Sequence, residues 1–300
     1  NASSENRTGG DMQYIKGLGD STHAYFEKNI SQRISSQAEI KVRLNEKSRF
    51  SVKNSVDHFD RVIQTPGYTF DGTQMAIFTE ANFTKENNGS EYILGANLFT
   101  DQFKENKTSP GNDRSYRQTT IGVFAQNTWD ISKLFSLESG LRGDYVLEYG
   151  AAILPRLSLL YKATDKLSSR LIGGIGYKTP SVFSEESERI QYRNVAAVTP
   201  DSNKLEKSYG GNWDVNYRTL LFDNKITFSV NQLFFYTYLD NPLMLGSPAP
   251  GQYRFKNIDG HIDAQGSETN IKIGLGHFKL FLGYTYTHTH VHTAASIQET

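Results

Sequence analysis

Apolar and polar residues alternate along most of this 300-residue chain, in segments of roughly ten residues or more. The clearest segment is 135–147, where Phe135, Leu141 and Tyr145 fall on one parity and Glu138 and Arg142 on the other. Because successive side chains of a β-strand point to opposite faces, this pattern predicts a strand with one apolar face and one charged face.

About a dozen such segments follow one another, and their connections are unequal. Short turns are expected near 45–48, 87–89, 132–133, 163–166, 223–225 and 274–277. The other connections are mostly long and polar, and the longest covers roughly 180–205. We therefore predict an all-β fold with antiparallel up-and-down strands, short turns at one end and loops at the other, which is typical of an outer-membrane β-barrel.

The charged positions of these strands, which alternate with the apolar ones, give a second indication of a barrel. Its members include Glu138, Arg142, Asp144, Arg156, Arg170 and Asp214. Burying so many charges in a solid core would be costly, so we predict that they face the lumen of a wide barrel, against water or a plug. If the apolar face is instead the core of a soluble β protein, the same charges are a solvated surface, and this alternative stays open here.

Composition narrows the class of protein. Hydrophobic residues make up 37% of the chain and mean hydropathy is −0.53, with no apolar run long enough for a transmembrane helix. Basic and acidic residues number 32 each, so nothing indicates a nucleic-acid surface. The absence of cysteine excludes a disulfide scaffold and a thiolate metal site.

Three histidines near the end of the chain are a candidate metal or haem ligand set. His288, His290 and His292 share one parity, but so do Phe278 and Tyr286 before them, so this face is expected to point to lipid. We therefore expect the histidines to lie on a solvated strand extension above the membrane, and predict no metal site and no cofactor.

No arrangement of residues indicates catalysis. The glycine run 173–176 lies within a predicted strand and precedes no helix, so it does not fit a phosphate loop. Asp57 and His58 are of a kind found in any large barrel. We predict that the chain is not an enzyme.

Ligand contacts are expected on the long loops and beside them, because binding residues concentrate on loops held by a rigid scaffold. The amphipathic candidates there are Tyr68, Phe70, Tyr192, Arg193, Tyr253 and Arg254. Aromatic rings suit flat or apolar ligands and arginine suits anionic ones. The simpler interpretation for each residue is ordinary loop packing.

Several ordered stretches resemble TonB-dependent outer-membrane receptors of the iron-complex and cobalamin type common in Bacteroidota. Residues 154–162 are similar to the family's Pro-Arg strand, and 176–183 to a segment that leads into a long extracellular loop. Residues 203–208 resemble the start of the next strand, although the family's proline is missing. Asn257, 266–268 and 283–286 are similar to a pattern of late barrel strands.

The resemblance implies a barrel of about 22 strands with a plug domain inside it. Residues 1–300 would then be a partial barrel domain of about twelve strands, with the plug and the final strands outside it. It further implies residence in the bacterial outer membrane, contact with its lipid, and TonB-energised uptake of a small-molecule ligand, an iron–siderophore complex or cobalamin. Two alternatives remain: a complete small barrel acting as a passive pore or adhesin, and a soluble β-rich enzyme or carbohydrate-binding module.

Overall fold

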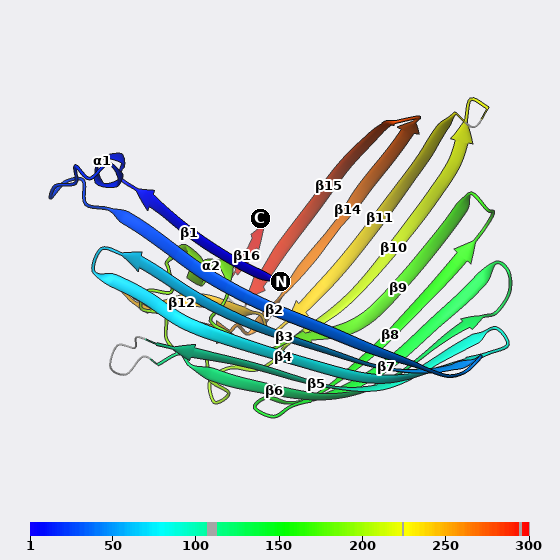
Figure 1. Cartoon of the computed structure of the whole chain (residues 1–300), viewed down its shortest axis with the longest axis horizontal. Coiled ribbons are helices and arrows are strands. Elements are labelled where there is room, and N and C mark those ends of the chain that lie inside the picture. The colour runs from blue at the N-terminus through cyan, green and yellow to red at the C-terminus, as the bar shows by residue number, and fades with distance from the viewer. Residues whose placement is uncertain (107–112, 224, 294–295, 300) are drawn as a thin grey trace.

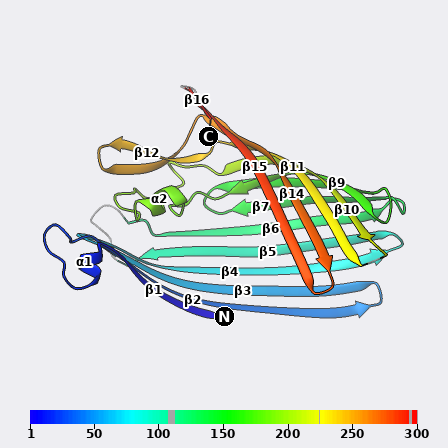
Figure 2. The same ribbon diagram turned by 90° about the horizontal axis from the view of Figure 1, so that it is seen from above.

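The computed structural model describes residues 1–106, 113–223, 225–293 and 296–299, with side chains up to Thr293. It shows one strongly curved antiparallel sheet of fourteen strands, ordered β1 to β11 and then β14, β15 and β16, and a separate hairpin of β12 and β13 (Figure 1). The predicted all-β, up-and-down fold is therefore confirmed. Figure 2 shows the sheet from above, with the β12–β13 hairpin and α2 at the same end.

The strands of the first half are β1 (Ala2–Gly10), β2 (Phe26–Asn45), β3 (Ser48–Thr65), β4 (Tyr68–Asn87), β5 (Ser90–Glu105), β6 (Tyr116–Asp130), β7 (Phe135–Val146) and β8 (Gly150–Lys162). Those of the second half are β9 (Leu167–Lys178), β10 (Glu206–Leu221), β11 (Ile226–Asp240), β12 (Leu243–Ala249), β13 (Gln252–Asn257), β14 (Gly260–Leu275), β15 (Phe278–Thr293) and β16 (Ser296–Glu299). Two short helices are α1 (Met12–Ile15) and α2 (Glu185–Arg189).

The sheet has more strands than the approximately twelve expected from the sequence. Residues 2–10 are polar and end in two glycines, yet they form β1, which pairs with β2 from Ala2–Ile34 to Gly10–Phe26. The polar connection after β11 contains the β12–β13 hairpin. In residues 2–10 backbone pairing overrides a composition that carries little apolar alternation.

The connections confirm the expected asymmetry at one end of the sheet, here called the turn end. All six connections there, from 46–47 to 276–277, are short. The opposite end, the loop end, is mixed. Pro66 and Gly67 form a tight hairpin turn between β3 and β4, in which Gly67 has φ +70°, a backbone conformation that glycine adopts without strain.

The two faces of the sheet differ in their chemistry. On the face here called the outer face, large apolar side chains such as Leu141, Ile153 and Trp213 are well exposed. The opposite, inner face carries most of the charged pairs, such as Arg33–Asp57 and Arg142–Asp144. An exposed apolar face on many successive strands is the surface that a lipid-embedded barrel wall presents. Neither described helix is long and apolar enough to cross a membrane.

The buried apolar residues form three small clusters, all toward the loop end. One centres on Phe70, Phe103 and Tyr192. The second contains Val146 and the third Val195. Among the described residues, these apolar clusters therefore lie where the loops fold onto the inner face of the sheet.

Candidate functional site

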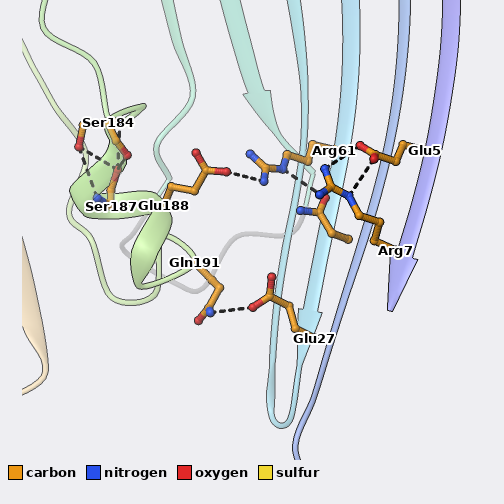
Figure 3. Close-up of polar contacts among 9 residues, drawn as sticks. Glu5, Arg7, Glu27, Arg61, Ser184, Ser187, Glu188 and Gln191 are labelled. Carbon is orange, nitrogen blue, oxygen red and sulfur yellow. Dashed lines mark hydrogen bonds and ion pairs between the residues drawn. The ribbon is translucent and has the colours of Figure 1, made fainter. Parts of the chain in front are cut away.

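The long loop 179–205, which joins β9 to β10 and contains α2, lies against the inner face of β2 and β3. Glu188 forms an ion pair with Arg61 of β3 at 2.6 Å, and Gln191 donates a hydrogen bond to Glu27 of β2 at 3.0 Å (Figure 3). The chain positions that meet here are more than 120 residues apart. The loop is therefore held by side chains from strands that are distant in sequence and in sheet order.

Local sequence explains why the loop contains a helical turn. Ser184 caps α2: its hydroxyl and that of Ser187 each accept a hydrogen bond from the other residue's backbone N–H. Ser187 is fully buried, and its hydroxyl also donates to the carbonyl of Val182. Capping of this kind satisfies two backbone donors at the start of the helical turn.

A buried ion pair at the end of β5 also anchors the loop. Arg114 pairs with Glu105 at the end of β5, and their side chains are only 3% and 2% exposed. Arg114 Nε donates to Glu105 Oε2 at 2.9 Å, and another guanidinium nitrogen donates to the backbone carbonyl of Tyr192 in the loop. The guanidinium also lies 5.4 Å from the centre of the Phe70 ring. A guanidinium desolvated to this extent is tolerated only because its donors are used.

Aromatic rings fill the space around this pair. The Phe70 and Tyr192 rings are 4.6 Å apart, and Phe183 packs edge-on against Phe103 at 4.8 Å. Burial, aided by the nearby charge of Glu188, raises the pKa of Tyr192 to about 12. The Tyr192 hydroxyl therefore stays neutral across the physiological range.

The same loop is held on its other side by the β12–β13 hairpin. The Tyr253 backbone N–H donates to the Asn194 carbonyl at 3.0 Å, and its carbonyl accepts from Ala196 N–H at 2.8 Å. The buried Asn203 side chain donates to the Phe255 carbonyl at 3.1 Å. The loop thus bridges the first strands of the sheet and the hairpin that precedes β14.

The structure brings five of the six predicted ligand-binding candidates to this loop. Phe70 and Tyr192 are buried in its packing at 1% and 3% exposure, so in this conformation they build the anchor. Tyr68 is half-buried under the guanidinium of Arg193, which lies 5.1 Å from its ring centre. Tyr253 contacts the loop through its backbone, as described. Their suggested role in ligand contact stays a prediction.

Two candidates are exposed at the loop end. Arg193 is exposed, although one of its nitrogens donates to the Pro66 carbonyl at 3.1 Å. Arg254 is exposed on β13. These two guanidinium groups are the exposed members of the predicted set, and their role in ligand contact stays a prediction.

The six residues predicted to face the lumen lie on the inner face. Strand register places Glu138, Arg142 and Asp144 on the same face as Gln118, whose amide donates to the Pro180 carbonyl of the loop. Through further cross-strand pairs the same face holds Arg156, Arg170 and Asp214.

These inner-face charges differ in how they are held. Asp144 is 4% exposed, accepts from Arg142 Nε at 2.8 Å and from the Tyr177 hydroxyl at 3.0 Å. Glu138 and Arg156 lie 4.0 Å apart and are partly exposed. Near the turn end, a cavity of about 550 Å³ is lined by cationic side chains that include Lys162, Arg170 and Arg218. Asp144 is therefore tightly held toward the loop end, whereas the part of the inner face formed by β8, β9 and β10 is open and basic toward the turn end.

Sequence reasoning missed the residues that hold the site together. Arg114 and Glu105 flank a polar connection, and nothing in their spacing indicates burial. The Arg61–Glu188 pair joins elements whose contact depends on how the loop folds. Only Phe183 carried a signal, since it lies in the family-like segment 176–183.

The three predicted histidines lie on the outer face, as expected from their parity. Register sets His292 opposite His261 and His290 opposite Asp263, on the face of the exposed Tyr284 and Tyr286. They are not a simple solvated extension, because His292 Nε2 lies 2.7 Å from Asp263 Oδ1 and the His261 and His292 rings stack at 4.3 Å. His261 and Asp263 were missed because their own strand carries no histidine repeat.

Several solved structures have a similar fold. The chain is similar to the meningococcal iron transporter FrpB (F5-1 variant, Neisseria meningitidis) at a TM-score of 0.64 and 12% identity, covering 91% of this chain and 50% of that one. It is similar to a double mutant of the Serratia marcescens hemophore receptor HasR, solved with its hemophore HasA and heme, at a TM-score of 0.63 and 13% identity, covering 97% and 58%. It is also similar to the ferric-catecholate import receptor Fiu of E. coli K12 at 0.61 and 12%, covering 89% and 48%.

The chain spans about half the length of these solved proteins, and identities at this level show the fold alone. No curated protein sequence matches the chain. A family model described as TonB dependent receptor-like, beta-barrel matches residues 4–299. That match covers nearly every strand, including those before residue 154, where the sequence showed alternation of apolar and polar residues but no family-like segment. The proteins of this family and the solved neighbours are outer-membrane receptors and transporters, not enzymes. The chain therefore belongs to the TonB-dependent receptor-like β-barrel family.

Proposed function

We propose that this chain forms part of the wall and of the extracellular vestibule of a TonB-energised receptor that takes up a scarce ligand across the outer membrane. The observation that carries the proposal is the loop 179–205, which is fixed onto the inner face by the Arg114–Glu105 and Arg61–Glu188 pairs. A loop held inside the wall narrows the entrance and presents side chains to a solute that enters there.

The inner face fits a wall that faces water or a plug. Its six predicted residues, Glu138, Arg142, Asp144, Arg156, Arg170 and Asp214, alternate with outer-face apolar residues. The basic cavity near the turn end offers cations to whatever occupies the lumen at that level. In the intact protein the plug domain and, through it, the TonB complex are the expected partners, in addition to lipid on the outer face.

We further propose an anionic iron–siderophore complex as the ligand, with cobalamin second. The solved neighbours include an iron transporter, a hemophore receptor, a ferric-catecholate receptor, siderophore receptors and a copper transporter. The exposed Arg193 and Arg254 suit oxygen-rich anions, since a guanidinium presents a planar fork of donors.

Growth and binding measurements test the proposal. A strain that lacks the gene is expected to fail on one ferric siderophore as sole iron source and to grow normally on ferrous iron. Arg254→Ala in the full-length protein is expected to weaken binding of that siderophore by about tenfold, the worth of one charge-assisted contact. Lys256→Ala, an exposed cation on the same strand, is the matched control.

Three outcomes would contradict the proposal in different ways. Loss of growth only on cobalamin would replace the ligand while keeping the transport function. Equal growth of the deletion strain on every iron and cobalamin source would remove both ligands. Passive entry that persists without the proton-motive force would favour a simple pore.

A further inference from the structure

We propose that His261, Asp263 and His292 form a binding site for a divalent transition-metal ion on the outer face of β14 and β15, with His290 as a further ligand. This site lies on the face opposite the loop and the inner wall. It is therefore separate from the transport path and does not depend on the identity of the transported ligand.

Strand register brings the four side chains together. His261 is directly opposite His292, and Asp263 is directly opposite His290, two residues further along the same face. Cross-strand neighbours and residues two apart on one strand are the closest side chains a sheet can offer. The backbone thus places the four side chains at the corners of one patch that spans two strands.

The ligand atoms are already close to one another. His292 Nε2 lies 2.7 Å from Asp263 Oδ1, His290 Nδ1 lies 3.4 Å from Asp263 Oδ2, and His261 Nε2 lies 3.9 Å from Asp263 Oδ1. One ligand atom from each of His261, Asp263 and His292 lies within 4.8 Å of the others. Donor atoms around a metal bonded at about 2.0–2.2 Å need to lie roughly 3 Å apart, so small side-chain rotations suffice.

The donor chemistry selects the class of ion. Imidazole nitrogens with one carboxylate suit Zn²⁺, Cu²⁺ and Ni²⁺, whereas Ca²⁺ and Mg²⁺ prefer all-oxygen sites. Asp263 is 14% exposed, which limits competition from water while leaving the histidines, at 20–32%, accessible from outside. A bound ion would also cross-link β14 to β15.

The position of the patch keeps it within reach of dissolved ions. On the outer face of β15, the exposed apolar run from Phe278 ends at Tyr284 and Tyr286 before the histidines begin. Tyrosines in that position are typical of the aromatic girdle at a membrane surface. The histidines beyond them therefore lie at the headgroup level or outside it.

A comparable pair on the same sheet provides a matched control. His58 and Asp60 lie on the outer face of β3, with His58 Nδ1 3.4 Å from Asp60 Oδ2. That pair offers one imidazole where the β14–β15 patch offers several. If ordinary His–Asp pairing accounted for metal affinity, the two sites would behave alike.

Copper titration of the full-length protein in detergent micelles tests the proposal, with electron paramagnetic resonance as the readout. The wild-type protein is expected to show a Cu²⁺ spectrum with hyperfine coupling from two or more imidazole nitrogens, and Zn²⁺ is expected to displace the ion. His261→Ala combined with His292→Ala should weaken binding at least about tenfold and remove that coupling. His58→Ala should leave both unchanged.

Asp263→Asn serves where the double alanine variant fails to fold, because it keeps the shape and a carbonyl oxygen but removes the charge. It too should weaken binding while circular dichroism still reports the sheet. The proposal is overturned if the double variant or, in its place, Asp263→Asn binds Cu²⁺ as the wild type does with the same nitrogen coupling. It is equally overturned if His58→Ala alone abolishes the signal.

Discussion

The inner face holds its charges in two different ways at its two ends. At the loop end, Arg114 and Glu105 are almost fully buried and their donors and acceptors are all directed to protein atoms. Closer to the turn end, Arg156 and Glu138 are 62% and 33% exposed and only just within 4.0 Å. Both are Arg–Glu pairs, but the first is shielded from solvent and the second is partly solvated.

Charge on the inner wall therefore serves two purposes. A buried pair is costly to desolvate and becomes strongly dependent on its partner, which suits an anchor. Exposed charges contribute little to folding and remain available to water or to a molecule in the lumen. Substitutions at the two ends should therefore differ sharply in their effect on stability.

The largest effect is expected at the buried pair. Arg114→Met should lower the free energy of unfolding by about 3–5 kcal/mol, because it leaves the Glu105 carboxylate buried without its partner. It should also expose loop 179–205 to protease. Chemical unfolding in detergent and limited proteolysis of the full-length protein measure the two effects.

The double variant Arg114→Met, Glu105→Leu is the control for this substitution. It should recover much of the lost stability, since no uncompensated charge remains. Wild-type stability in Arg114→Met alone would show that the loop is held by other contacts.

A smaller loss of about 1–3 kcal/mol is expected for Gly122→Ala, on the inner face between the two ends. A Cβ at Gly122 would overlap Asn97 Oδ1 and Asp144 Oδ1, and both of these side chains are buried. Gly143→Ala on the neighbouring strand is the matched control, because its Cβ would meet nothing within 4 Å. Equal unfolding curves for the two variants would contradict the close packing described for Asp144.

High pH is expected to destabilise the packing at the loop end by a smaller amount. The folded pKa of Tyr192, about 12, lies above the ordinary tyrosine value near 10. Its contribution to stability is therefore complete below about pH 10 and is lost as pH rises from there toward 12. Protease sensitivity of the loop should rise in that window, and Tyr192→Phe should blunt the rise, unless the hydroxyl titrates normally.

The smallest effect is expected near the turn end. Glu138→Ala or Arg156→Ala should change the free energy of unfolding by less than about 0.5 kcal/mol, since the pair is partly solvated. Thermal unfolding beside the Arg114 variants measures the contrast. A loss comparable to that of Arg114→Met would mean that this end is packed against something that buries the pair.

The sequence predicted the strands and their faces well because both depend on local alternation. Residues 135–147 form β7 within a residue, and their parity matches the exposed and inward faces that the structure gives them. The resemblance of residues 154–183 to receptor segments likewise pointed to the family that the whole-chain match shows. Where alternation was weak, as in residues 2–10, pairing with a neighbour created a strand that no local signal announced.

The site was less predictable because its contacts are long-range. Tyr192 and Phe70 were chosen as amphipathic loop residues, and the structure buries both instead of leaving them exposed. Their burial depends on Arg114, which contacts both residues. That contact forms only because loop 179–205 folds back across the sheet. The histidine patch shows the same limit, since the pairing of β14 with β15 is what brings His261 next to His292.

Loop 179–205 has a geometric consequence for the passage. The sheet is strongly curved (Figure 1), and the loop is attached to β2 and β3 at one place and to the β12–β13 hairpin at another. In a closed barrel the number and stagger of the strands set the diameter, so the loop narrows the passage without determining the width of the wall. A solute that displaced the loop would therefore widen the passage while the strands keep their arrangement.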